Sequence, residues 1–269
     1  MKNLFKSIIA AFSMFSRIPM PRIEWSGDVM RHMMTAFPLV GVVIGGLMLA
    51  FLRIADCLAL PTPLRAIGMT LLPLAVTGGI HLDGLCDTCD AIGAVTTPEK
   101  RREILKDPRA GAFGVIGVAT YLLTYFALAL AFDADLYGRL LYCYGFVLSR
   151  GLSADAITRF KPAPDGTGRA FHDAAGEKGQ RAVFIAFCLP LICIALFSER
   201  FADGIDGNAA FMLPVWLFAS LACYLSLKRT AKKKFEGMSG DLAGWFLQRC
   251  ELWQLAAIVI MSALARRLP

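Results

Sequence analysis

The sequence predicts an all-α polytopic integral membrane helical bundle with about seven transmembrane helices and an N-terminal interfacial helix. Three observations lead to this fold class. Hydrophobic residues make up 57% of the 269 residues, and the mean hydropathy of +0.57 exceeds that expected of a soluble domain of this length. The apolar residues form continuous runs and do not alternate over about ten residues, which favours helices over a β-barrel. Lys and Arg are concentrated in alternate connecting segments, as in a multi-pass membrane protein.

We expect one membrane domain, residues 1–269, in which residues 1–34 form an amphipathic interfacial segment and residues 35–269 form the transmembrane bundle. Lys2 and Lys6 precede a short apolar run that ends at Phe15. The following residues, 16–19, do not form a small-residue cleavage site. The first helix is therefore expected to be retained and to lie on the membrane surface.

Seven apolar runs predict the spans, and several approach the roughly 20 residues that a helix needs to cross a bilayer. They lie near residues 35–52, 65–80, 112–132, 136–157, 182–198, 209–227 and 252–265. If the N-terminus is cytoplasmic, the cytoplasmic segments are 1–34, 81–111, 158–181 and 228–250, which hold 5, 5, 5 and 6 Lys or Arg. The opposite loops and the C-terminus together hold six. This bias predicts the orientation, and it explains the net charge of +7 without nucleic acid as a partner.

Residues 78–93 form the centre around which the chain is organised, because they place His81, Asp83, Asp87 and Asp90 within ten residues. In a helix the three carboxylates fall at i, i+4 and i+7 and share one face. Like charges at this distance repel unless a cation lies between them. Hard oxygen ligands suit Mg²⁺, or Mn²⁺, better than Zn²⁺.

Two alternatives remain open for the same stretch. Acidic residues are common at the start of a helix because they interact favourably with its positive end. His81, Cys86 and Cys89 include a C-x-x-C pair, which is one half of a zinc site. No second Cys or His pair at ligand spacing accompanies it, so the zinc interpretation is the weaker one.

Two arginines are candidates for substrate contact. Arg109 follows a short basic helix that Thr97 and Pro98 should begin. Arg109 either contributes ordinary positive-inside charge or contacts phosphate. Arg150 lies inside the fourth apolar run, where a charge costs about 3 kcal/mol on insertion scales. We therefore expect Arg150 to face the bundle interior with an anionic partner, with snorkelling to the membrane surface as the alternative.

Two glycine-containing segments complete the set of candidates. Gly166, Gly168 and Arg169 lie in a loop that is either a plain linker or a phosphate-binding stretch of exposed amides. Gly240 and Asp241 lie where a helix should open, so that an acid and a positive helix end reach the same side of the membrane. Carboxylates, basic residues and glycine-rich backbone together suit phosphoryl or nucleotidyl transfer, but they do not name a substrate.

Motifs at six places, spread over nearly the whole chain, resemble one family. They are residues 15–21 (FSRIPMP), 79–90 (GIHLDGLCDTCD), 106–114 (KDPRAGAFG), 149–150, 166–168, and 240–244 with Glu251. In these positions the sequence resembles the cobalamin synthase family, also called adenosylcobinamide-GDP ribazoletransferase. Its departures are Cys86 and Cys89 in place of Ala, Ala91 where Gly is frequent, and an altered sequence at 161–164.

The resemblance implies an enzyme of the bacterial cytoplasmic membrane, with its active-site loops on the cytoplasmic side. It would join adenosylcobinamide-GDP to α-ribazole, or to α-ribazole 5′-phosphate, and release GMP. By analogy Asp83, Asp87 and Asp90 hold Mg²⁺, and one of them or His81 is the base. Substrate contacts are expected from Arg109, Arg150, Gly166, Gly168, Arg169, Gly240 and Asp241. Membrane lipid is a further expected partner, and homo-oligomer formation is left open.

Two rival functions are weaker. A CDP-alcohol phosphotransferase or a prenyltransferase would carry D-G-x-x-A-R or a paired N-D-x-x-D, and the chain has neither. A transporter would place its acids near the bilayer midplane between repeated halves. No internal repeat is evident, and the acidic stretch lies at the end of an apolar run.

Overall fold

The computed structural model describes residues 2–164, 168–175 and 209–267, and within these ranges the chain is built from α-helices. The described part contains no strand, only an isolated bridge between Pro162 and Met238. The predicted all-α fold is confirmed. The predicted span at 182–198 and the candidate residue Gly166 lie outside the described residues.

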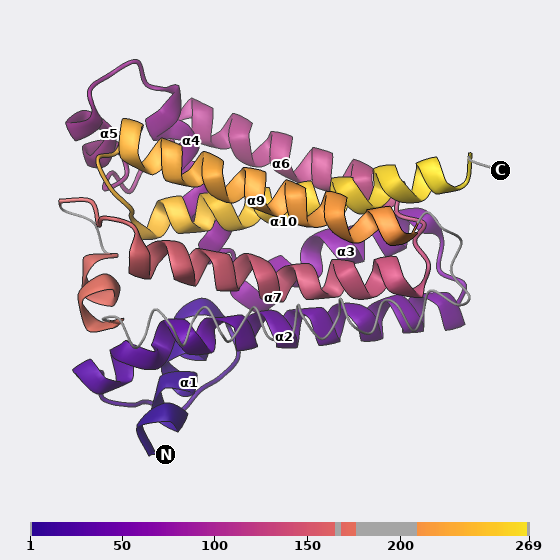
Figure 1. Cartoon of the computed structure of the whole chain (residues 1–269), viewed down its shortest axis with the longest axis horizontal. Helices are drawn as coiled ribbons and strands as arrows, with labels where there is room; N and C mark the ends of the chain where they lie inside the picture. Colours follow the sequence, from indigo (N-terminus) through magenta and orange to yellow (C-terminus); the bar gives the residue numbers. More distant parts are fainter. Residues whose placement is uncertain (1, 165–167, 176–208, 268–269) are drawn as a thin grey trace.

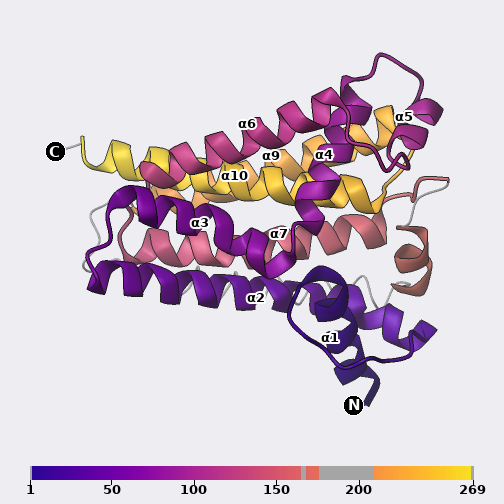
Figure 2. The ribbon, with the colours of Figure 1, turned by 180° about the vertical axis from the view of Figure 1, so that it is seen from behind.

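Long helices that run side by side form the bundle (Figures 1 and 2). Its main members are α2 (Gly27–Cys57), α6 (Ala112–Leu130), α7 (Leu136–Arg159), α9 (Ala209–Lys234) and α10 (Gly240–Ala265). Helix α7 packs against α2 on one side and α10 on the other, and α10 also packs against α9. The short helix α1 (Lys2–Phe15) lies at one end, against α2.

Polar side chains begin several of these helices, and the sequence predicted one of them, Thr97. The Asp135 side chain accepts a hydrogen bond from the Gly138 amide at the start of α7, and Ser239 accepts one from Leu242 at the start of α10. Thr97 accepts one from the Lys100 amide at the start of α5 (Pro98–Ile104). These oxygens satisfy amides that have no partner within the first turn of a helix.

Three described helices are long and apolar enough to cross a membrane: Gly27–Cys57, Ala112–Leu130 and Phe211–Lys234. A bent pair, Thr62–Thr77 with Ile80–Gly93, makes a fourth if it counts as one span. Helices α7 and α10 have 24 and 26 residues but carry buried polar groups such as Arg150 and Glu251. The structure thus supports a membrane bundle, and the number seven stays a prediction.

The bend between α3 (Thr62–Thr77) and α4 (Ile80–Gly93) is the feature that most shapes the site. The two helices meet at 95°, because Gly78 and Gly79 adopt φ values of 67° and 81°. Glycine takes this left-handed conformation without the steric cost that a side chain would add. The acidic stretch therefore turns into the bundle, where α4 packs against α10 and α6.

The ends of helices that carry the candidate residues gather on one side of the molecule. Helices α4 and α5, the first turns of α6 and α10 and the last turns of α7 and α9 lie together there, and the C-terminus lies at the far end (Figure 1). Two backbone hydrogen bonds join the segments after α7 and before α10, from Met238 to Lys161 at 2.8 Å and from Ala163 to Met238 at 3.0 Å. Described parts of the four segments predicted to be cytoplasmic thus share one end.

Candidate active site

The close crossing of α4 and α10 brings the acidic residues together. A Cβ on Gly84 would lie 2.8 Å from the Asp241 carbonyl oxygen, and one on Gly244 would lie 3.0 Å from the carbonyl oxygen of His81. Such distances leave no room for larger residues without a shift of backbone. The two glycines thereby let α10 present Asp241 beside the acidic face of α4.

Three carboxylates from two helices form the acidic wall of the site: Asp83, Asp87 and Asp241. Asp241 on α10 lies close enough to Asp83 and Asp87 on α4 for their charges to repel one another. Within the described residues none of the three forms an ion pair. A cluster of negative charges without a cationic partner is chemically suited to a divalent cation.

No three His, Cys, Asp or Glu side chains in the described part of the chain are grouped closely enough to be a ready-made metal centre. The predicted trio of Asp83, Asp87 and Asp90 is therefore not preassembled, and the same holds for the acidic wall and for the alternative site of His81 with two cysteines. The oxygen donors present nevertheless fit Mg²⁺ in type, and Asp241 belongs among them.

Asp90 has a different environment from the other two members of the predicted trio. Its carboxylate accepts hydrogen bonds from the backbone amides of Gly111 and Gly114, at 2.7 and 2.8 Å. It thus caps the N-terminus of α6, where a negative charge is favourable. Both oxygens are engaged, so in this structure Asp90 ties α4 to α6.

We expect Gly114→Ala to loosen this connection. The new Cβ would lie 2.3 Å from an Asp90 carboxylate oxygen and 2.7 Å from the Cys86 sulfur, so the start of α6 must move. Overpacking of this kind costs roughly 1–3 kcal/mol. Thermal unfolding in detergent measures the loss, and Gly46→Ala on α2, which meets nothing within 4 Å, is the matched control. Equal unfolding temperatures for the two variants would contradict the capping role of Asp90.

His81 lies in an aromatic cluster beside the acidic wall. It is 6% exposed, and its ring centroid lies 6.1 Å from that of Phe15 and 5.7 Å from that of Phe37. Its Nε2 atom is buried with no hydrogen-bond partner in the described structure. A buried polar atom without a partner carries a free-energy cost, which a ligand can remove.

Two hollows share Asp83 as a wall. One is a cavity of about 220 Å³ between α1, α2, α4, α7 and α10, with Asp83 and Asp241 in its lining. The other is an open groove of about 380 Å³ along α4, lined by Gly78, Gly79, Asp83 and Cys86 among others. Asp83 is itself exposed, so it can contact ligands in either hollow.

The match to known proteins covers almost the whole chain. The family model described as cobalamin-5-phosphate synthase matches residues 7–259. This chain belongs to the cobalamin-5-phosphate synthase family. Members of this family are transferases of cobalamin biosynthesis, so the chain is an enzyme, as the motifs predicted.

Curated relatives agree with this assignment. The chain is 38% identical over 255 residues to the adenosylcobinamide-GDP ribazoletransferase of Lachnoclostridium phytofermentans, covering 94% of this chain and 93% of the relative. It is 32% identical over 250 residues to the enzyme of the same name from Clostridium botulinum strain Alaska E43, with 92% and 94% covered. No solved structure matches the chain significantly.

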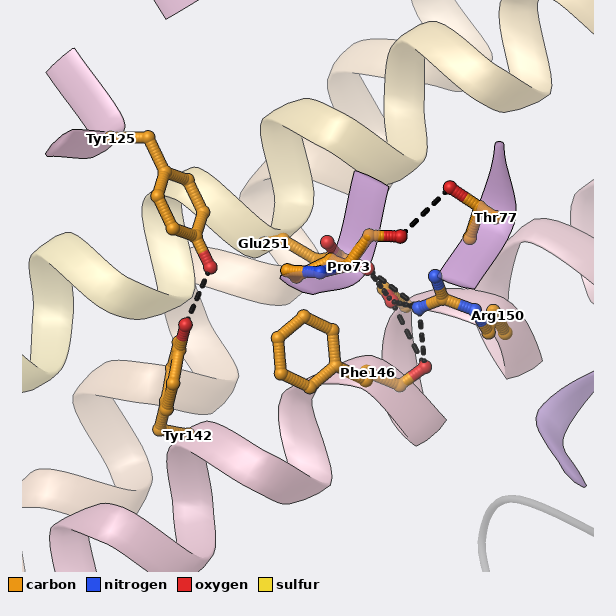
Figure 3. Close-up of polar contacts among 8 residues, drawn as sticks. Pro73, Thr77, Tyr125, Tyr142, Phe146, Arg150 and Glu251 are labelled. Atoms are coloured by element: carbon orange, nitrogen blue, oxygen red, sulfur yellow. Dashed lines mark hydrogen bonds and ion pairs between the residues drawn. The ribbon is translucent and has the colours of Figure 1, made fainter. Parts of the chain in front are cut away.

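Arg150 of this cobalamin-5-phosphate synthase family member is held inside the bundle. The side chain is 1% exposed and donates hydrogen bonds to the Glu251 carboxylate at 2.6 Å and to the Phe146 carbonyl at 2.9 Å (Figure 3). Ser149 donates to the same Glu251 oxygen at 3.0 Å. The expected interior position and anionic partner are confirmed, whereas a substrate contact by Arg150 stays a prediction.

The remaining family motifs lie at the same end of the molecule. Arg109 is exposed. Its guanidinium donates two hydrogen bonds to Asp107 and its backbone amide donates a third, and together they lower the pKa of that carboxyl to about 2. Gly168 packs close to Ile157, and Arg169 is exposed at the start of the helical stretch 169–175. Gly240 is exposed in the first turn of α10. Their substrate contacts stay predictions.

Arg17 is a candidate whose role the sequence did not reveal. It lies against the bend, since a Cβ on Gly78 would meet its Nε at 2.3 Å, and its backbone amide donates to the Val76 carbonyl at 2.8 Å. Arg17 is exposed, and no described carboxylate pairs with it. Arg17 belongs to the family motif at 15–21, which could have marked it as a functional residue. Its position beside the groove, however, follows only from the fold.

Proposed function

We propose that this protein joins adenosylcobinamide-GDP to α-ribazole, or to α-ribazole 5′-phosphate, and releases GMP. The observation that carries the proposal is the match of residues 7–259 to the family, together with relatives named adenosylcobinamide-GDP ribazoletransferase. The acidic wall supports it, because one of its carboxylates, Asp83, lines both a largely apolar cavity and an open groove.

The reaction is a displacement at phosphorus. A ribose hydroxyl of the acceptor attacks the phosphorus bonded to cobinamide, the bond from that phosphorus to the oxygen of GMP breaks, and GMP departs. The hydroxyl proton must be taken up by a base. Asp83 is suited to this role because it is exposed and lines both hollows. His81 is less accessible, since only 6% of its surface is exposed.

The acidic wall would hold the cation that the family resemblance implies. Asp83, Asp87 and Asp241 are the residues we assign to it, because Asp90 is occupied by two amides. Mg²⁺ bound there, or Mn²⁺ in its place, would neutralise charge on the departing GMP. The exposed Arg17 is placed to attract phosphate oxygens in the groove, as a bidentate donor.

The activity is tested with the purified chain in liposomes. GMP release should require both adenosylcobinamide-GDP and α-ribazole, and a corrinoid product should form in equal amount. Addition of EDTA should stop the reaction, and Mg²⁺ should restore it. GMP formed at the same rate without an acceptor would indicate hydrolysis and would contradict the proposal.

We further propose that the clustered helix ends face the cytoplasm of a bacterial cell, within the cytoplasmic membrane. The Lys and Arg distribution supports this orientation. In a background without other cysteines, Lys233→Cys should be protected from an impermeant thiol reagent added to intact cells. The native Cys57, exposed at the opposite end of α2, should react. The reverse pattern would show that the orientation is wrong.

A further inference from the structure

We infer that the cavity of about 220 Å³ binds the aromatic base of the acceptor, so that Asp83 separates an apolar acceptor chamber from a phosphate-binding groove. The inference rests on the proposed function and specifies which part of the site each substrate occupies.

The size of the cavity suits a ligand with a small, flat ring system. An apolar cavity of about 150 Å³ is sufficient to bind benzene, and pockets for larger, drug-sized ligands measure about 300–1,000 Å³. A cavity of about 220 Å³ therefore suits a bicyclic base such as the benzimidazole of α-ribazole. It is too small for the corrin ring or for the whole of the donor.

The lining has the chemistry that an uncharged aromatic base requires. Six apolar side chains from α1, α2, α7 and the stretch 169–175 contribute to it: Met14, Phe15, Met34, Phe37, Ile157 and Phe171. The ring centroids of Phe15 and Phe37 lie 4.2 Å from each other, and both rings lie next to His81. These aromatic rings offer surfaces for stacking. The unpartnered Nε2 of His81 supplies a polar atom to this cluster that a ring nitrogen can satisfy.

The cavity itself offers no cationic side chain to the donor. Its lining in the described structure contains the carboxylates of Asp83 and Asp241 and no Lys or Arg. A cation held by these carboxylates would lie at the edge of the cavity shared with the groove, and the aliphatic and aromatic remainder of the lining has no group that binds a diphosphate. The groove on the other side of Asp83 has Arg17 beside it, so the phosphates are better placed there.

Steady-state kinetics with the full-length chain in liposomes test this division. Ala243 lines the cavity on α10, and Ala243→Leu should partly fill it. Because misfit of a methylene or two in an apolar pocket changes discrimination by roughly 10–200-fold, we expect the KM for α-ribazole to rise at least about tenfold. The KM for adenosylcobinamide-GDP should stay within about twofold of the wild-type value, because the donor lies outside the cavity.

Matched variants distinguish a specific effect on acceptor binding from a general loss of folding or activity. Ala263→Leu introduces the same side chain on α10 away from the cavity and should leave both KM values unchanged. Arg17→Gln should show the opposite pattern, with a raised KM for the donor and an unaltered KM for α-ribazole. Phe171→Ala, which removes part of the cavity wall, should raise the acceptor KM and serves as the test if Ala243→Leu fails to fold.

Free 5,6-dimethylbenzimidazole provides a probe that needs no variant. It should inhibit the wild-type enzyme competitively against α-ribazole and not against the donor. If Ala243→Leu and Phe171→Ala turn over with unaltered acceptor KM, the inference is wrong while the proposed function stands. If the wild-type chain releases no GMP with either acceptor, both are wrong.

Discussion

Asp83→Asn is expected to lower the rate of GMP release by roughly 10²-fold or more, which is the range seen when one electrostatic stabiliser of a transition state is removed. Its side chain is exposed and forms no ion pair in the described structure, so the substitution should leave folding intact. Asn keeps the size of the side chain and removes the charge. Losses of similar size are expected for Asp87→Asn and Asp241→Asn.

Asp90→Asn distinguishes the acidic wall from a helix cap. Asn remains a good cap, and the lost interaction with the helix dipole costs about 0.3–1 kcal/mol. We therefore expect Asp90→Asn to lower the unfolding temperature slightly and to keep much more activity than the other three variants. Rates and unfolding temperatures measured on the same liposome and detergent preparations provide the comparison. If well-folded Asp83, Asp87 and Asp241 variants each keep more than about half of wild-type activity, these carboxylates do not hold a catalytic cation.

Glu251→Leu is expected to produce the largest loss of stability, roughly 3–5 kcal/mol, because it leaves Arg150 charged and buried without its partner. Arg150 and Glu251 are 1% and 4% exposed, and they join α7 to α10 at 2.6 Å. Arg150→Met should cost a comparable amount, since the carboxylate then lacks its cation. Chemical unfolding in detergent measures both.

The double variant Arg150→Met/Glu251→Leu is the control for this pair. Removal of both charges abolishes the desolvation cost together with the attraction, so most of the lost stability should return. Single variants as stable as the wild type would show that water or another group compensates the charge. A double variant less stable than either single variant would contradict the pairwise explanation.

Features that depend on neighbouring residues in the chain were predictable. Continuous apolar runs indicated helices, because a helix satisfies its backbone hydrogen bonds internally whatever packs against it. Thr97 was expected as a cap from local spacing alone, and its side chain accepts the Lys100 amide. The helical face shared by Asp83, Asp87 and Asp90 also follows from a local period of 3.6 residues. The family, too, was identified from short motifs.

The role of each acidic residue in the site depended on contacts between segments far apart in the chain, which local periodicity does not specify. Asp90 lies on the same helical face as Asp83 and Asp87, yet it caps α6 because the Gly111 and Gly114 amides reach it. Asp241 joins the acidic wall because α10 crosses α4 at Gly84 and Gly244. A helical pattern predicts which side chains share a face, whereas the packing of whole helices determines what that face meets.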